Sequence, residues 1–457
     1  ALLLLVLLHQ LGAPRFVKAT APLFFVTHPL HTEAVAYISG RADMMSAIGI
    51  FGALCFAVSV IRLEHPFSGT MAATVFFVAG LLSKESTLIY PVLLAIVFAA
   101  VITDKERKSV AAEEEVPPLW RFMPLAASGV VLTVYMILRA TVLRFARGQS
   151  SVAPSLSTRL VETFQSLGVY AKLLFIPTGL HMERTLHNVS ALYILAGGLF
   201  FALLIAAITV SWRLGHKRIA AGFAWFLAAW FPVSGIFPLN APLAEHWMYV
   251  PMAGFWWSLM EIVRHVCGNN TRRLKAAYAG AFLLCVVFIA ATAQRNLDWH
   301  DNERLFRATL EQNPNTMRVH YNLAVTYDSI QENYAGARRH YERYLELRMR
   351  EQERQTAARP ALTGDDIEVR LSLGRVLMHL GEYEAAVNVL VPLKQLAEID
   401  VWRPAAAMAA VETGKALLAL GDIGQAHMYF QEALTIDPEL YEEVENILSG
   451  MPFYDGY

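Results

Sequence analysis

Nine long apolar runs fill the first two-thirds of this chain and constrain its fold more than any other feature. They cover roughly residues 21–38, 44–61, 70–83, 86–103, 121–143, 192–212, 219–239, 247–266 and 274–293. About 20 mostly apolar residues are needed for a helix to cross a bilayer. Each run therefore predicts a membrane-spanning helix, although the run at 70–83 is short. Residues 1–13 resemble the last turns of an earlier helix, so we expect the natural sequence to continue upstream.

The distribution of charge divides the chain in two. Only 17% of the 457 residues are charged, whereas ordinary soluble domains carry about 25%. Residues 1–299 contain 23 Lys and Arg against 14 Asp and Glu, and residues 300–457 contain 15 against 25. The neutral total therefore combines a basic membrane part with an acidic soluble part.

Basic residues between the apolar runs predict the orientation, because Lys and Arg stay on the cytoplasmic side. The groups are Arg15/Lys18, Lys105/Arg107/Lys108, Arg213/Lys217/Arg218 and Arg264/Arg272/Arg273/Lys275. All four share one side only if residues 160–178 do not cross. That segment contains Glu162 and Lys172, and an interfacial helix suits it. The alternative, a tenth crossing, would invert everything that follows.

The last third has the pattern of helical repeats. The clearest repeat is 407–440, where Gly414, Leu417, Gly421, Ala426, Phe430, Ala433 and Pro438 fit a 34-residue helix–turn–helix unit. Residues 369–395 and 318–347 give two more, the latter with an extra residue in its turn. We therefore predict an all-α chain. A polytopic transmembrane bundle covers residues 1–295, and a tetratricopeptide-repeat α-solenoid covers 296–457. Such stacks usually offer a groove for a protein partner.

Ionisable residues collect in the loops on the predicted non-cytoplasmic side. These loops are 28–43, 83–86, 181–185 and 240–251. Charge near a membrane is costly, so such clusters are candidate functional sites. We predict Glu33 and Asp43 as the catalytic acid or base. The candidates for binding substrate or donor phosphate are His28, His31, Arg41, Lys84, Glu85, Glu183, Arg184, Glu245, His246 and Tyr249. The alternative is that these residues only fix helix ends by pairing or form an interfacial belt.

Several classes of chemistry lack support in the sequence. It contains no G-x-x-x-x-G-K-S/T, no G-x-G-x-x-G after a strand and no H-E-x-x-H. The three cysteines have no metal-ligand spacing. His28 and His31 lack a defined third ligand, so we predict no metal site. No cofactor is firmly indicated, and a divalent metal is left as an open alternative. Nucleic acid is not an expected partner.

Three motifs carry a family resemblance. HPLHTEAVAYISGRADMMSA at 28–47, SKES at 83–86 and AEHWMYVPMAGF at 244–255, followed by the repeats, resemble the transmembrane and tetratricopeptide-repeat O-mannosyltransferases and their bacterial relatives. The resemblance implies a GT-C-type glycosyltransferase fold. It also implies that the main catalytic acid lies in a first outer loop upstream of residue 1. His246 departs from the family, which usually has Arg there.

The resemblance implies a specific reaction. A sugar, mannose or another hexose, would pass from a polyprenyl- or dolichyl-phosphate carrier to a protein hydroxyl, with the repeats positioning the acceptor. The expected location is a bacterial inner membrane with periplasmic repeats, or an endoplasmic reticulum membrane with luminal repeats. The alternative is a non-catalytic membrane scaffold that binds a protein partner through its repeats. A transporter is disfavoured, because matching halves with broken helices are not evident.

Overall fold

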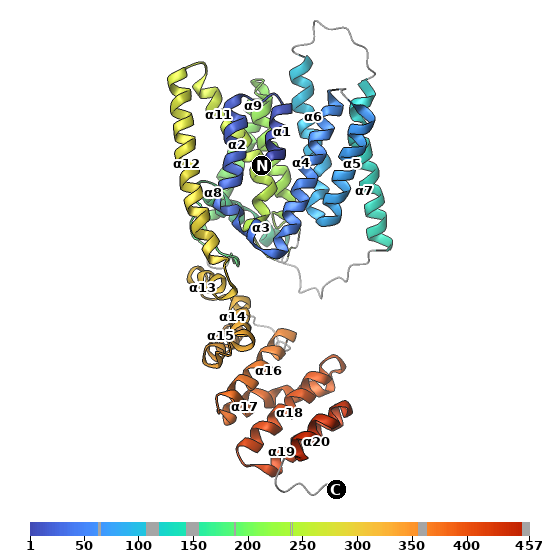
Figure 1. Ribbon diagram of the computed structural model, residues 1–457, viewed down its shortest axis with the longest axis vertical. Helices are drawn as coiled ribbons and strands as arrows, with labels where there is room; N and C mark the ends of the chain where they lie inside the picture. Colours follow the sequence, from blue (N-terminus) through green and yellow to red (C-terminus); the bar gives the residue numbers. More distant parts are fainter. Residues whose placement is uncertain are drawn as a thin grey trace. The chain divides into compact units, whose positions relative to one another are not determined.

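The computed structural model describes residues 1–62, 65–106, 118–142, 155–186, 189–237, 239, 241–354 and 363–449. The regular elements in these ranges are all helical. The chain divides into two compact units, Ala1–His300 and Asp301–Tyr457 (Figure 1). The predicted all-α chain, with apolar helices followed by tetratricopeptide repeats, is confirmed.

The first unit is a bundle of mostly long helices. They are α1 (Leu2–Gln10), α2 (Arg15–Thr27), α3 (Thr32–Ala36), α4 (Arg41–Ile61), α5 (Pro66–Ser83), α6 (Tyr90–Glu106), α7 (Met123–Thr141), α8 (Leu156–Phe175), α9 (Leu192–Arg213), α10 (Lys217–Trp230), α11 (Tyr249–Cys267) and α12 (Thr271–Asp298). Within the described ranges, five helical stretches are long and apolar enough to cross a membrane: Ile38–Ile61, Pro66–Ser83, Leu119–Thr141, Leu192–Arg213 and Thr271–Asp298. The chain is therefore an integral membrane protein by length and composition.

The run predicted as one helix over 21–38 is broken in the structure. Helix α2 begins earlier, at Arg15, and ends at Thr27, where the backbone of His28 becomes extended. Pro29 explains the break, because a proline disfavours helical geometry in the residue before it. A 3₁₀ turn, Pro29–His31, and the short α3 follow. The break places the polar residues that follow Thr27 at the end of the bundle and not within a long helix.

Helix α8 covers the segment whose crossing was in question. It is 20 residues long, but it is not among the five long apolar stretches. Its position as an interfacial helix stays a prediction. It packs closely on α9, since Gly168 and Gly197 face each other across the contact. Small residues let membrane helices approach until backbone meets backbone.

The second unit is a stack of helix pairs. Its elements are α13 (Asn302–Gln312), α14 (Met317–Val325), α15 (Tyr334–Arg354), α16 (Gly364–His379), α17 (Tyr383–Leu390), α18 (Arg403–Ala419), α19 (Ile423–Ile436) and α20 (Tyr441–Ser449). Gly414 and Gly374 leave room for the side chains of Phe430 and Leu390 from the paired helix. This is the small/large complementation that the repeat pattern predicted.

The predicted extra residue in the 318–347 repeat has a structural counterpart. Helix α14 continues as a π-helical turn, Thr326–Ile330, and one inserted residue produces such a bulge. The turn then passes through Glu332 with a φ of 52°. The other two repeats use Gly381 and Gly421 at their turns, with φ of 76° and 82°. A non-glycine residue in this region is unfavourable, so the insertion imposes some strain.

A single methyl group at the α8–α9 contact tests the packing of the bundle. In Gly197→Ala, the new Cβ would overlap the carbonyl oxygen of Phe164, which is backbone and cannot rotate away. We expect a loss of about 1–3 kcal/mol, measured as a lower unfolding temperature in detergent. The matched control is Gly198→Ala, where a Cβ meets nothing within 4 Å. Equal effects of the two changes would contradict this packing.

The repeat unit should lose stability in mild acid. Nδ1 of His320 lies 2.9 Å from Nδ1 of His340. Burial and the neighbouring His320 lower the pKa of His340 from 6.5 to about 4. The unfolded chain therefore takes up the proton first, so this stability is present above pH 6.5 and is lost as pH falls towards 4. Hydrogen exchange of α14 and α15 should accelerate over that window, and His340→Asn should flatten the response. An unchanged response in the variant would contradict this origin.

Candidate functional site

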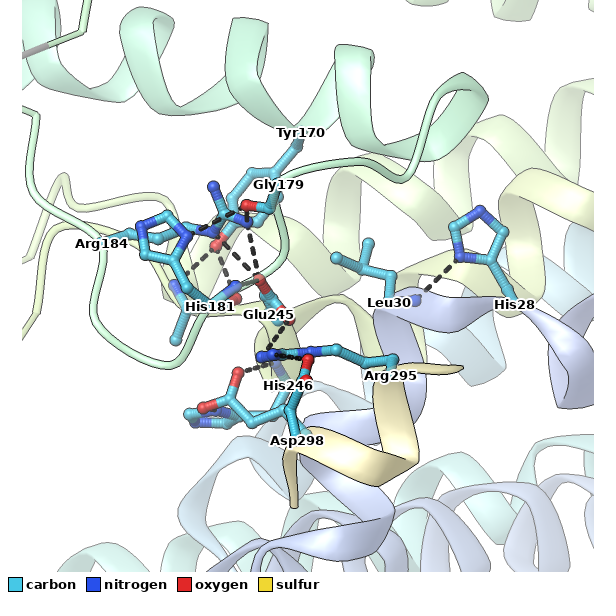
Figure 2. A network of polar contacts seen from close by, with 12 residues as sticks. His28, Leu30, Tyr170, Gly179, His181, Arg184, Glu245, His246, Arg295 and Asp298 are labelled. Carbon is cyan, nitrogen blue, oxygen red and sulfur yellow. Dashed lines mark hydrogen bonds and ion pairs between the residues drawn. The ribbon is translucent and has the colours of Figure 1, made fainter. Parts of the chain in front are cut away.

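A buried carboxylate, that of Glu245, organises the polar end of the bundle. Its side chain is fully buried. Oε1 accepts hydrogen bonds from Nη2 and Nε of Arg184, at 2.7 and 3.2 Å, and from the backbone N–H of His181 at 2.7 Å. Oε2 lies 3.8 Å from Nη2 of Arg295 (Figure 2). Loop 181–185, 61 positions from Glu245 at Arg184, and the end of α12 therefore meet at this side chain.

Helix α8 fixes the backbone that carries Glu245. The hydroxyl of Tyr170 donates to the carbonyl of Ala244 at 2.9 Å and accepts from its N–H at 3.0 Å. Both backbone groups of the preceding residue are thereby satisfied by one buried side chain. The short 3₁₀ turn Glu245–Met248 then leads into α11. The backbone at Glu245 is therefore held in position independently of the contacts of the Glu245 side chain.

Glu33 and His246 form the second contact between loops. Oε1 of Glu33 lies 2.9 Å from Nδ1 of His246, and Oε2 accepts a hydrogen bond from the His246 N–H at 3.1 Å. Both oxygens of Glu33 thus contact a single residue from a loop 213 positions away. Together, Glu33, Arg184, Glu245, His246 and Arg295 are called the loop cluster below.

Arg295 belongs to the loop cluster but was not predicted. Only 5% of it is exposed, and its Nη1 donates to Asp298 at 2.9 Å. Its Nε and Nη2 make no hydrogen bond to described residues, which leaves buried donors available to another group. In the sequence it follows the apolar run 274–293 and looks like an ordinary interfacial anchor. Nothing local distinguished it from other basic residues at helix ends.

Burial changes the protonation of the loop cluster. It raises the pKa of the Glu245 carboxyl above its usual value, while the charges of Arg184 and Arg295 oppose the change. Burial, with the same two guanidiniums, lowers the pKa of the adjacent His181 to about 3. His181 is therefore neutral at physiological pH. The fixed cations of the loop cluster are the two arginines.

A second group joins loops 28–43 and 83–86. Nζ of Lys84 lies 2.6 Å from Oδ1 of Asp43, and the Lys84 side chain is 30% exposed. Arg41, in the first turn of α4, is exposed, and no ion pair to it is seen among the described residues. Arg41, Asp43 and Lys84 are called the rim group below. The two cations of this group are more exposed than the loop cluster, whereas Asp43 is buried, with 11% of its side chain exposed.

The remaining predicted residues have other surroundings. Glu85 pairs with Arg139 and accepts a hydrogen bond from the Tyr135 hydroxyl at 2.7 Å, so it turns towards α7. Glu183 is half-buried beside Arg184. Lys84 and Glu85 face different partners because the backbone of Lys84 is extended while Glu85 begins a 3₁₀ turn. The two adjacent charges therefore point to different partners.

The two histidines and Tyr249 have structural contacts. Nδ1 of His28 accepts from the Leu30 N–H at 3.2 Å, and Nε2 therefore donates to the carbonyl of Leu174, also at 3.2 Å. Nδ1 of His31 lies 2.6 Å from the carbonyl oxygen of Phe25. The His31 ring packs on the Tyr249 ring, with 4.7 Å between the ring centroids. In the part of the chain that the structure describes, no group of three or more His, Cys, Asp or Glu could hold a metal ion.

Comparisons with known proteins point the same way as the motifs. Tetratricopeptide-repeat models match residues 290–353 and 411–440. The chain is 24% identical over 346 residues to human Protein O-mannosyl-transferase TMTC4, covering 68% of this chain and 46% of the relative. It is 25% identical over 412 residues to human Protein O-mannosyl-transferase TMTC3, covering 82% and 42%.

A nematode relative extends the comparison. Protein O-mannosyl-transferase F38B6.6 of Caenorhabditis elegans is 24% identical over 319 residues, covering 67% of this chain and 42% of the relative. The chain is a relative of the transmembrane and tetratricopeptide-repeat O-mannosyltransferases. It spans less than half the length of these curated relatives. The resemblance read from the motifs is confirmed.

A double-mutant cycle measures the central ion pair of the loop cluster. Glu245→Gln and Arg184→Gln each leave a buried charge without its partner, so we expect each to cost about 3–5 kcal/mol. The double variant should be more stable than the sum of the two effects implies, by about 0.5–3 kcal/mol. Unfolding in detergent gives the values. As a control, Glu245→Gln combined with Arg139→Gln should be additive, because Arg139 pairs with Glu85 instead. Coupling in the control alone would contradict the assignment.

Proposed function

We propose that this protein transfers a sugar, mannose or another hexose, from a polyprenyl- or dolichyl-phosphate carrier to a protein hydroxyl. The observation that carries the proposal is the convergence of polar loops. Glu33, Arg184 and Glu245 come from segments far apart in sequence and meet at one end of an apolar bundle. Buried charge of this density is costly and favours a functional role over packing alone. The names of the relatives supply the reaction class.

The rim group combines a carboxylate with two partly exposed cations. One carboxylate oxygen of Asp43 accepts a hydrogen bond from Lys84. Asp43 can take the proton of an acceptor hydroxyl while the hydroxyl oxygen attacks the anomeric carbon of the sugar. The bond from the anomeric carbon to the phosphate oxygen breaks in the same displacement, which inverts the configuration. Arg41 and Lys84 can stabilise the charge that develops on the leaving phosphate.

The loop cluster has a supporting role in this scheme. Glu33 is held by two contacts to His246, and Glu245 neutralises Arg184. These residues position the loops, while the unused donors of Arg295 remain available to a phosphate. Of the two acids predicted to be catalytic, Asp43 is therefore favoured over Glu33.

The repeats are proposed to hold the acceptor protein. Helix α12 ends at Asp298 in contact with the loop cluster through Arg295. The chain therefore leaves the bundle at its polar end, and the second unit begins at Asp301. An acceptor bound by the repeats would share a compartment with the rim group, the lumen of the endoplasmic reticulum or the periplasm.

Transfer assays with full-length protein in membranes test the proposal. With a mannosyl-phosphoryl polyprenol and an acceptor protein, Asp43→Asn should lower kcat by about 10²–10⁴-fold, the usual range for a lost acid or base. Arg41→Gln should weaken donor binding and thereby raise KM, because hydrogen bonds to charged groups are worth about 1.5–3 kcal/mol.

The matched control is Arg62→Gln, at the opposite end of α4 from Arg41. It should leave both constants unchanged. If folded protein carrying Asp43→Asn transfers sugar at the normal rate, Asp43 is not the base. If the unaltered full-length protein transfers none but still captures the acceptor through its repeats, the scaffold hypothesis is favoured.

A further inference from the structure

Basic residues from separate segments line a cleft at the other end of the bundle. The cleft has a volume of about 280 Å³, and its charged lining comes from the start of α10 and from α11. Among the described lining residues, Lys217, Arg218 and Arg264 accompany one carboxylate, that of Glu261, so the cations outnumber it by two. His216 and His265 add two imidazoles whose ring centres are 4.2 Å apart. Nothing in the proposed transfer reaction uses these side chains.

The cleft is far from the loop cluster along the same helix. Helix α11 begins at Tyr249, three residues after His246, and ends at Cys267, two residues after His265. A helix of this length is about 28 Å long, which is close to the thickness of the bilayer's hydrocarbon core. Figure 1 draws the α11–α12 turn and the end of α12 at opposite ends of the bundle. The two charged regions therefore face opposite surfaces of a membrane.

The cations of the cleft are held in place by contacts within the protein, and Lys217 and Arg264 have donors beyond these contacts. Nε of Arg218 donates to Glu261 at 2.9 Å, and Glu261 is buried. Nζ of Lys217 donates one hydrogen bond to the carbonyl of Trp212 at 3.1 Å, and Arg264 donates to the carbonyl of Gly268. An ammonium has three donors and a guanidinium five. The N-cap of α10, His216, contributes no capping side chain, which adds the positive end of a helix dipole.

Exposed apolar residues are the sequence neighbours of residues that line the cleft. Leu214 and Val266 are each 66% exposed. Trp212 is 40% exposed and lies 3.6 Å beneath the ammonium of Lys217. Exposed aliphatic side chains beside a tryptophan are typical of the boundary between head groups and acyl chains. A ligand with a phosphate and an acyl chain fits both surfaces, whereas free phosphate fits only the cations.

We propose that this cleft binds the phosphate head group of an anionic membrane lipid, with the acyl chains against Leu214 and Val266. Basic pockets between membrane helices recognise such head groups, and each Lys or Arg near an anionic surface contributes about 1 kcal/mol. Binding would brace α10 against α11, since the lining residues come from both helices. It requires no sugar transfer.

Binding to purified protein in a neutral detergent tests the proposal. The probes are dioctanoyl phosphatidic acid, dioctanoyl phosphatidylcholine and inorganic phosphate, followed by native mass spectrometry and by the shift of the unfolding temperature. We expect the acidic lipid to bind and stabilise the protein, and the other two to do so at least tenfold more weakly. Each cation removed should weaken binding about fivefold, so Lys217→Gln with Arg264→Gln should weaken it about 25-fold.

Charge-matched variants separate a built cleft from a generally basic surface. Arg272→Gln with Arg273→Gln removes the same charge from exposed residues at the start of α12, outside the cleft. That pair should leave lipid affinity nearly unchanged. Lys217→Arg with Arg264→Lys keeps the charge and should retain binding, which controls for folding. Equal losses in the two Gln pairs would overturn the proposal, as would equal binding of inorganic phosphate or phosphatidylcholine.

Discussion

The burial of the Glu245 carboxylate is the constraint on which the polar end of this bundle depends. A charge removed from water costs several kcal/mol unless opposite charges and hydrogen-bond donors replace the solvent. Arg184, Arg295 and the N–H of His181 provide that replacement. Arg184 and His181 belong to the loop after α8 and Arg295 to the end of α12, so satisfying this one side chain fixes that loop, the entrance to α11 and the end of α12 together.

Helix packing in the apolar part obeys a different rule. Lipid is as apolar as the helix surfaces, so burying leucine gives no advantage, and close backbone approach does the stabilising. Gly49 faces Gly80 across α4 and α5, Gly168 faces Gly197 across α8 and α9, and Gly222 faces Gly254 across α10 and α11. Charge specifies one end of the bundle, and glycine specifies how closely its helices lie.

The two ends of the bundle have opposite chemical character. In the loop cluster, carboxylates and guanidiniums are buried and paired. At the other end, cations outnumber carboxylates and sit among exposed aliphatic side chains. Our two proposals rest on this asymmetry: a lipid-linked donor at the first end and the head group of an acidic lipid at the second.

The sequence by itself determined the class of the fold. Apolar runs of about 20 residues and a 34-residue small/large repeat are local patterns, and each element follows from its own composition. The motifs at 28–47 and 244–255 were likewise sufficient to identify the relatives. Pro29 could have ended the first predicted helix at Thr27, since its effect on His28 is also local.

Only the tertiary structure decided which polar residues meet. Lys84 and Glu85 are adjacent, yet one contacts Asp43 and the other Arg139. Arg295 looked like an interfacial anchor and is buried against Glu245. Pairing across 41 to 213 positions depends on helix packing and on the loops between helices. No local pattern records it, because a charge can satisfy its burial with any suitable partner that the fold brings near.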